Sequence, residues 1–149
     1  MHARIATVAF HGIDVLEVDV QVSMAGAGSG VFNVVGLPDK AVAESRERVR
    51  AALGALGLGL PPERITVNLA PADLAKEGSH YDLPIALALM VAMRVLPADE
   101  IAGYVALGEL GLDARIAPVT GVLPAAVAAN ARGKGSYRSM YGDLQVRLS

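Results

Sequence analysis

The chain has 149 residues, no cysteine, no tryptophan and a formal net charge of −2. This length predicts a single domain. The absence of cysteine excludes a disulfide framework and thiolate chemistry, and the slightly acidic balance gives no overall basic signature for nucleic acid. The longest apolar run, residues 83–93, is too short to span a membrane and fits a buried helix. We therefore expect a cytoplasmic protein with no membrane segment and no signal peptide.

The first half of the chain predicts a block of strands followed by a helix. Strands are expected over residues 4–10, 13–22 and 31–35. The second strand is the clearest, because three valines between positions 18 and 22 alternate with polar residues. The segment Gly36-Leu37-Pro38-Asp39 starts a helix, since proline fits the first turn and aspartate complements the helix dipole. Gly57 and Gly59 end it.

The second half alternates helices and strands. We expect a buried strand over 64–69, a buried helix from Tyr81 or Asp82 to Pro97, strands over 103–107 and 114–116, and an alanine-rich helix from about 122 to 131. This order predicts an α/β fold, an α+β sandwich whose mixed sheet carries helices mainly on one face. Residues 1–132 form the domain. Residues 133–149 lack its apolar periodicity, and we interpret them as a tail that is either non-native or disordered.

The densest cluster of polar side chains lies in the loop before the second long helix. It consists of Lys76, Glu77, Ser79, His80 and Asp82. A loop this polar between two apolar elements is typical of a site for binding or chemistry. Because it precedes a helix, the favoured interpretation is that Ser79, His80 and Asp82 cap unpaired N–H groups. The same helix end attracts anions, with Lys76 adding positive charge and the two carboxylates opposing it, so this loop is the first candidate binding surface.

A second candidate surface is the first long helix, where Arg46, Arg48 and Arg50 are interleaved with Glu44 and Glu47. Mixed signs are typical of a solvated face, and contact with DNA or a protein partner is the minority interpretation.

Three kinds of site are not predicted: a metal site, a P-loop and a dinucleotide-binding loop. Glu77, His80 and Asp82 are potential metal ligands, but the sequence has no second cluster to complete a metal site. The sequence also has no G-x-x-x-x-G-K-[ST] motif, so it should not hydrolyse ATP by a P-loop mechanism. The glycines between positions 26 and 30 precede a strand rather than a helix, which favours a bend or a hairpin loop over a dinucleotide site.

Several long segments, in order, resemble one protein family. These are residues 35–53, 68–73, 81–86, 108–110 and 118–124, and together they cover about residues 3–132. They resemble the magnesium-chelatase-like bacterial proteins of the competence-protein ComM family. The sequence departs from the family pattern at Ala114, where glycine is expected, and at Tyr81, where phenylalanine is common.

The resemblance implies a fold and a context. It implies a domain similar to the proteolytic domain of Lon protease, of the type of the second domain of small-subunit ribosomal protein five. It also implies an AAA+ ATPase module downstream in the same chain, which would bind ATP and Mg²⁺. The full-length protein would form a hexamer with a role in DNA recombination, through branch migration during natural transformation. Insertion of magnesium into a porphyrin is not expected, because nothing here recognises a tetrapyrrole.

The Lon likeness permits a test of catalysis, because active Lon domains use a serine nucleophile with a lysine base. Matching Glu77-Gly78 to the family's acidic-glycine pair places the serine position on His80, one residue beyond Ser79. The lysine position falls on Leu123. We therefore expect a non-catalytic accessory domain that holds no cofactor and contacts the ATPase module, DNA or a partner. The alternative is a peptidase with Ser79 as nucleophile and Lys76 as base.

Overall fold

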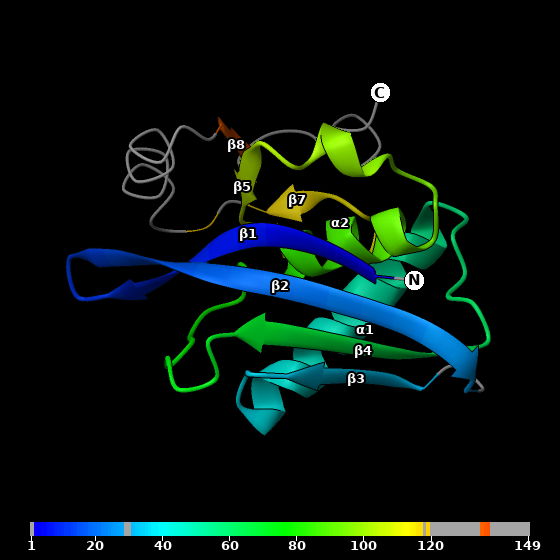
Figure 1. Cartoon of the computed structure of the whole chain (residues 1–149), viewed down its shortest axis with the longest axis horizontal. Coiled ribbons are helices and arrows are strands. Elements are labelled where there is room, and N and C mark those ends of the chain that lie inside the picture. Colours follow the sequence, from blue (N-terminus) through cyan, green and yellow to red (C-terminus); the bar gives the residue numbers. More distant parts are fainter. Residues whose placement is uncertain (1, 29–30, 118, 120–134, 138–149) are drawn as a thin grey trace.

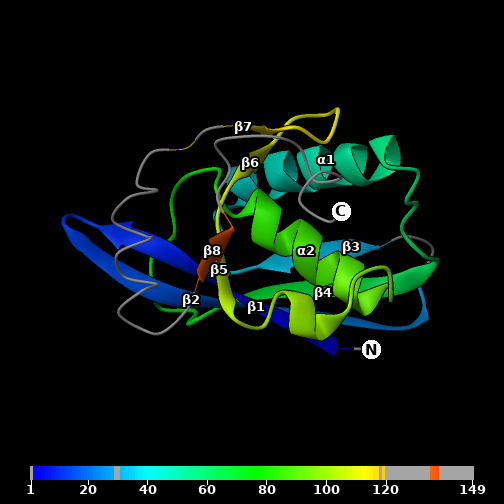
Figure 2. The ribbon, with the colours of Figure 1, turned by 90° about the horizontal axis from the view of Figure 1, so that it is seen from above.

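The computed structural model describes residues 2–28, 31–117, 119 and 135–137. A six-stranded mixed sheet has the strand order β3-β4-β2-β1-β5-β8, and a small antiparallel pair, β6 and β7, lies apart from it. Figures 1 and 2 show both long helices over one face of the large sheet. The elements are β1 (His2–His11), β2 (Asp14–Ala27), β3 (Phe32–Val35), α1 (Asp39–Ala55), β4 (Glu63–Ala70), α2 (Asp82–Ala92), the 3₁₀ helix η1 (Ala98–Glu100), β5 (Tyr104–Ala106), β6 (Glu109–Leu110), β7 (Ile116–Ala117) and β8 (Gly135–Tyr137). The predicted α/β class and mixed sheet are confirmed.

The strand directions bring several loops to one edge of the sheet. β2 pairs antiparallel with β1 and with β4, whereas β3 and β4, β1 and β5, and β5 and β8 are parallel pairs. The strands β1, β3, β4 and β5 therefore all end at the same side, which we call the carboxyl edge. Parallel α/β sheets place their binding sites at this edge. The loop before α2 lies there, because it follows β4 directly.

The predicted alternation in β2 places its valines on the buried face of the sheet. Val18, Val20 and Val22 are at most 2% exposed, and Val20 lies opposite Leu69 of β4. The strand runs to Ala27, further than predicted, and its register with β4 shifts between Ala25 and Ala27. Gly26 has a φ of +71°, so the bend expected at the glycines is a bulge within the strand.

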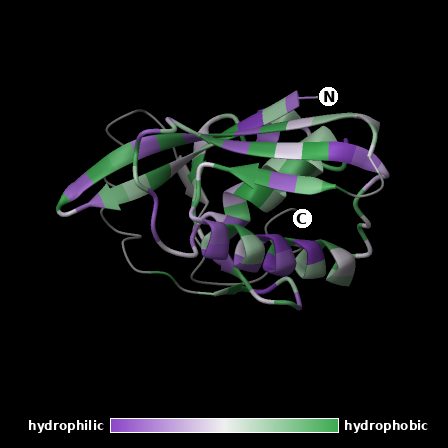
Figure 3. Cartoon of the chain, turned by 90° about the horizontal axis from the view of Figure 1, so that it is seen from below, coloured by the Kyte–Doolittle hydropathy of each residue, from purple (hydrophilic) through white to green (hydrophobic). Residues whose placement is uncertain are grey.

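The two helices differ in how much of their surface they bury. α1 packs Val49, Ala52 and Leu53 into the core and leaves much of its remaining surface exposed. Figure 3 shows hydrophilic and hydrophobic bands that alternate along this helix. Every residue of α2 is buried, because α2 contacts β1 and β2 on one side and α1 on another. The expected buried helix is thus confirmed, but it ends at Ala92 and does not reach Pro97. Arg94 has a φ of +63°, a left-handed conformation that does not continue a helix. Within the described ranges, no helix combines the length and apolar character needed to cross a membrane.

The C-terminal part differs from the sequence interpretation at one place. Gly135–Tyr137, within the segment interpreted as a tail, forms β8 and pairs with β5 through backbone hydrogen bonds. Three residues are too few to show the alternation that marks a strand, so the pattern did not predict it. The predicted helix over 122–131 lies outside the described residues.

Candidate functional site

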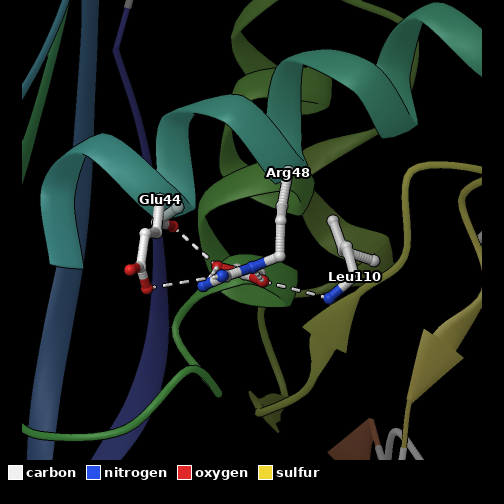
Figure 4. A network of polar contacts seen from close by, with 5 residues as sticks. Glu44, Arg48 and Leu110 are labelled. Atoms are coloured by element: carbon white, nitrogen blue, oxygen red, sulfur yellow. Dashed lines mark hydrogen bonds and ion pairs between the residues drawn. The ribbon is translucent and has the colours of Figure 1, made fainter. Parts of the chain in front are cut away.

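The Asp82 carboxylate is the centre of a buried polar joint between α1, α2 and β6. Figure 4 shows Arg48 of α1 and Leu110 of β6 pointing toward this joint. Ser45 Oγ donates to Oδ1 at 2.7 Å, and Arg48 donates through Nε to Oδ2 at 2.6 Å and through Nη2 to Oδ1 at 3.2 Å. The backbone N–H of Leu110 donates to Oδ2 at 3.1 Å. Asp82 is fully buried. One side chain therefore fixes three elements relative to one another.

The charges of this joint are balanced internally. Burial raises the pKa of the Asp82 carboxyl, while hydrogen bonds from Arg48, Ser45 and Leu110 oppose that rise. The hydrogen bond to Asp82 raises the pKa of Arg48, although burial of the guanidinium opposes it. An ionised carboxylate only accepts hydrogen bonds, and four donors surround Asp82, so the geometry is that of a carboxylate–guanidinium ion pair. Neither charge is left free to act on a ligand.

Lys76 is also committed to the fold. Its Nζ donates to the carbonyl oxygens of Pro71 at 2.6 Å and Leu74 at 2.8 Å, and the residue is 2% exposed. Burial lowers the pKa of the Lys76 amine, and the nearby Asp73 carboxylate opposes that shift. The Lys76 amine therefore holds together the backbone of the loop that contains it. The expectation that Lys76 adds positive charge to the loop surface is wrong, because the ammonium is buried against carbonyl oxygens. Of the two carboxylates expected to oppose it, Glu77 is exposed and Asp82 is buried.

His80 anchors the same loop to the sheet. Its Nε2 lies 2.7 Å from the Val8 carbonyl oxygen, which requires the hydrogen to be on Nε2. The ring packs edge-on to Phe10, with centroids 5.3 Å apart, and against the Tyr81 ring at 4.1 Å. Burial lowers the pKa of His80, and the hydrogen bond to Val8 opposes the shift. His80 is thus a buried neutral histidine that joins the loop to β1.

The predicted capping of α2 by Ser79, His80 and Asp82 is wrong. The N-cap residue is Tyr81, and no side chain caps the helix. The side chains of His80 and Asp82 instead bond to Val8 of β1 and Arg48 of α1. Among the described residues, no group of three or more histidine, aspartate or glutamate side chains is placed to hold a metal ion. Of the predicted cluster, Glu77 and Ser79 remain accessible to solvent.

The three arginines of α1 have different roles. Arg46 donates through Nη1 to the Phe32 carbonyl oxygen at 3.0 Å, and the Arg50 guanidinium lies 5.9 Å from the Phe32 ring centroid. Arg48 pairs with Asp82, and its Nη1 lies 3.9 Å from Glu44 Oε2, an i,i+4 contact typical of helices. The structure therefore does not bring the arginines together as one basic patch, because Arg46 and Arg50 contact β3 whereas Arg48 contacts α2.

Sequence reasoning missed Ser45 and Tyr81. Ser45 lies three residues before Arg48, so a polar pair on the apolar side of α1 was the only signal for its contact with Asp82. The Tyr81 ring is buried beside His80, and burial and the Glu77 charge raise the pKa of its hydroxyl. No described residue pairs with that hydroxyl or with the buried hydroxyl of Thr7.

Two adjoining cavities lie at the carboxyl edge between the start of α1 and the loop before α2. One of about 430 Å³ is lined mainly by Leu37, Ala72, Leu74 and Ala75, and the other, of about 390 Å³, by Lys40, Ala41, Gly78 and Ser79. They share Pro38, Lys76 and Glu77, and we call the pair the Pro38 groove. The groove is the open part of the site, since the polar joint beneath it is buried.

The fold and site define an α/β domain with a structural polar joint at the carboxyl edge of its sheet. A family model described as subunit ChlI of Mg-chelatase matches residues 18–137. The chain belongs to this ChlI family.

Proteins from three organisms are similar in sequence to this chain. The chain is 42% identical over 118 residues to competence protein ComM of Haemophilus influenzae, which covers 79% of the chain and 23% of that protein. It is 39% identical over 148 residues to the uncharacterised protein YifB of Salmonella typhimurium, which covers 99% of the chain and 28% of YifB. An uncharacterised protein of Mycobacterium tuberculosis is 43% identical over 130 residues, covering 87% of the chain and 26% of that protein. The chain spans about a quarter of the length of these relatives.

Proposed function

We propose that this chain is a non-catalytic accessory domain of Lon-like fold, which acts through contacts within a larger protein related to ComM. The proposal is supported by one observation: the side chains that could be reactive are held in hydrogen bonds and an ion pair within the domain. Asp82 is paired with Arg48, His80 is bonded to Val8 and the Lys76 amine is bonded to two carbonyl oxygens. Side chains with these partners hold elements together, and a substrate would have to displace those bonds.

The larger context follows from the family. In this proposal an AAA+ module elsewhere in the same polypeptide binds ATP and Mg²⁺, because the chain spans only about a quarter of the length of its relatives. These 149 residues themselves contain no P-loop motif. The full-length protein is a hexamer that works in the cytoplasm on DNA, in branch migration. Membership in the ChlI family and the likeness to a competence protein support this reading. The domain's part is to hold or position a partner of that ring.

The peptidase alternative has less support from the geometry. Ser79 and Lys76 both line the Pro38 groove, but the hydrogen bonds of the Lys76 amine go to Pro71 and Leu74. A general base needs a free lone pair directed at the nucleophile. Among the described residues, no hydrogen bond joins the Lys76 amine to the Ser79 hydroxyl.

The proposal is tested on the protein that the complete source gene encodes. We expect its reading frame to continue beyond Ser149 into a G-x-x-x-x-G-K-[ST] motif, and its product to hydrolyse ATP and migrate DNA branches. Exchanging residues 2–117 for a linker should retain ATP hydrolysis but reduce branch migration, and substitution of Ser79 by alanine in the intact protein should change neither. A frame without that motif, or loss of branch migration on removal of the Ser79 hydroxyl alone, would contradict the proposal.

A further inference from the structure

The charges around the Pro38 groove are predominantly negative at its surface. Asp73 and Glu77 are exposed, and the Glu44 side chain is 53% exposed. Among the residues that line the groove, neither Asp73 nor Glu77 forms an ion pair or hydrogen bond with another described side chain. The opposing cations are largely withdrawn, because Lys76 is buried against carbonyl oxygens and Arg48 is paired with Asp82. Lys40 is the exposed cation of the lining.

The surface between these carboxylates is apolar. Leu37 and Leu74 are partly buried and pack against the core, and Pro38, Ala72 and Ala75 complete this part of the groove. An apolar floor with carboxylates at its rim is complementary to a chain that carries apolar and cationic side chains together. The same rim repels the phosphate backbone of a nucleic acid, which opposes the anion-binding interpretation of this loop.

The backbone at the groove provides a further means of holding a peptide. No side chain caps the N-terminus of α1, whose first turn begins directly after Pro38. The first N–H groups of a helix have no partner within the helix. They are therefore available to the carbonyl oxygens of an extended peptide in the groove.

We propose that the Pro38 groove binds an extended protein segment in which lysine or arginine alternates with apolar side chains. This inference rests on the proposed accessory role, because it names the chemistry of the partner that the domain holds. The apolar side chains would pack on Leu37 and Leu74, and the cations would face Asp73 and Glu77. The contact is non-covalent and requires no reaction at Ser79.

The probe is a fluorescein-labelled eight-residue peptide of alternating leucine and lysine, titrated with the 149-residue chain and followed by anisotropy. The matched control peptide alternates leucine and glutamate. We expect saturable binding of the lysine peptide below about 1 mM and none of the glutamate peptide. Reversing one rim charge, Glu77→Lys, should weaken binding about tenfold. The control Asp99→Lys has the same charge change at an exposed residue of η1, beyond the other end of α2, and should leave affinity within about twofold.

Several results would overturn the inference. They are a lysine peptide that does not bind, equal weakening by Glu77→Lys and Asp99→Lys, and tighter binding of branched DNA at the groove. Self-association of the chain that Glu77→Lys abolishes would assign the groove to a second copy and would also overturn it. If Glu77→Lys does not fold, amide NMR shifts on the unaltered chain decide instead. When the lysine peptide is added, the amide shift changes must concentrate in residues 37–41 and 72–77 and not in residues 98–100.

Failure of this inference and failure of the accessory role are distinguishable. A chain that binds no peptide, but whose Ser79 is unreactive, retains the accessory role and loses the groove. A chain whose Ser79 reacts as a nucleophile loses the accessory role, whatever its affinity for peptides.

Discussion

Arg48 of α1 and Asp82 of α2 form a buried ion pair in which Nε and Oδ2 are 2.6 Å apart. The guanidinium side chain is 23% exposed, whereas the carboxylate has no exposed surface. The pair therefore lies just beneath the Pro38 groove, whose lining includes Arg48. Because this ion pair joins the lining of the groove to the buried core, we expect a substitution of either residue to lower the free energy of unfolding as its main effect.

Substituting Arg48 by methionine should cost about 3–5 kcal/mol of unfolding free energy, because it leaves the buried Asp82 carboxylate without its charged partner. The double variant with Asp82→Asn should lose less than the sum of the two single variants, since the removed groups are partners. Urea denaturation at pH 7 measures both. The matched control, Arg50→Met, removes an exposed cation over Phe32 and should cost less than about 1 kcal/mol. A loss below 1 kcal/mol for Arg48→Met would show that the pair is not a joint.

His80 predicts a specific pH dependence of stability. Burial lowers its folded-state pKa below the ordinary value of 6.5, so between those two pKa values the unfolded chain binds a proton that the folded chain does not. The contribution of His80 is therefore complete above about pH 6.5 and is lost as the pH falls below it, by at most about 1.4 kcal/mol per pH unit.

Replacing His80 by phenylalanine should remove this slope, whatever it does to stability at neutral pH. Denaturation at pH 7, 6 and 5 measures the difference between the variant and the original chain. His2→Gln is the control, since His2 is exposed at the start of β1 and should leave the slope unchanged. Parallel pH profiles for His80→Phe and the unaltered chain would show that His80 is not the group responsible.

Gly78 should resist substitution, because its φ of +102° is a conformation that side chains rarely adopt, and an added Cβ would lie 3.0 Å from His80 Nδ1. Gly78→Ala is expected to destabilise the chain by about 1–3 kcal/mol. Gly54→Ala is the matched control, since Gly54 is helical and an added Cβ would meet no atom within 4 Å. It should stabilise by about 0.5–1 kcal/mol. Equal thermal shifts of the two variants would contradict the assigned loop conformation.

Tyr81→Phe should leave the unfolding free energy unchanged or raise it by about 1 kcal/mol, because the buried hydroxyl has no partner among the described residues. The ring itself is needed, so Tyr81→Ala should cost about 3–5 kcal/mol. Thermal denaturation of the two variants distinguishes these contributions. A loss above 1 kcal/mol for Tyr81→Phe would reveal a hydrogen bond that the structure does not account for.

The sequence predicted those features that depend on local pattern. Alternation defined the buried face of β2, and the proline and glycines placed the ends of α1 close to their observed positions. The family pattern also expected glycine at position 114, and Ala114 there has a φ of +72°, which is the left-handed region that glycine favours. Each of these depends on residues close together in the chain.

The sequence singled out the polar loop before α2 as the candidate site, but the roles of its side chains could not be assigned from it. The partners of Asp82 come from residues 34 and 37 positions earlier and from Leu110, 28 positions later. His80 is bonded to Val8, 72 positions away. No local pattern encodes such distances, so side chains expected to cap a helix or present charge were instead structural.

The measurement that tests the account most directly is labelling of Ser79 by a fluorophosphonate probe, read by intact-mass and peptide mass spectrometry on the folded chain. If Lys76 serves the fold, no adduct should form at Ser79, and Lys76→Ala should lower the unfolding temperature without changing that result. A stoichiometric adduct at Ser79 that disappears in Lys76→Ala, with the fold retained, would show a catalytic pair and contradict the account.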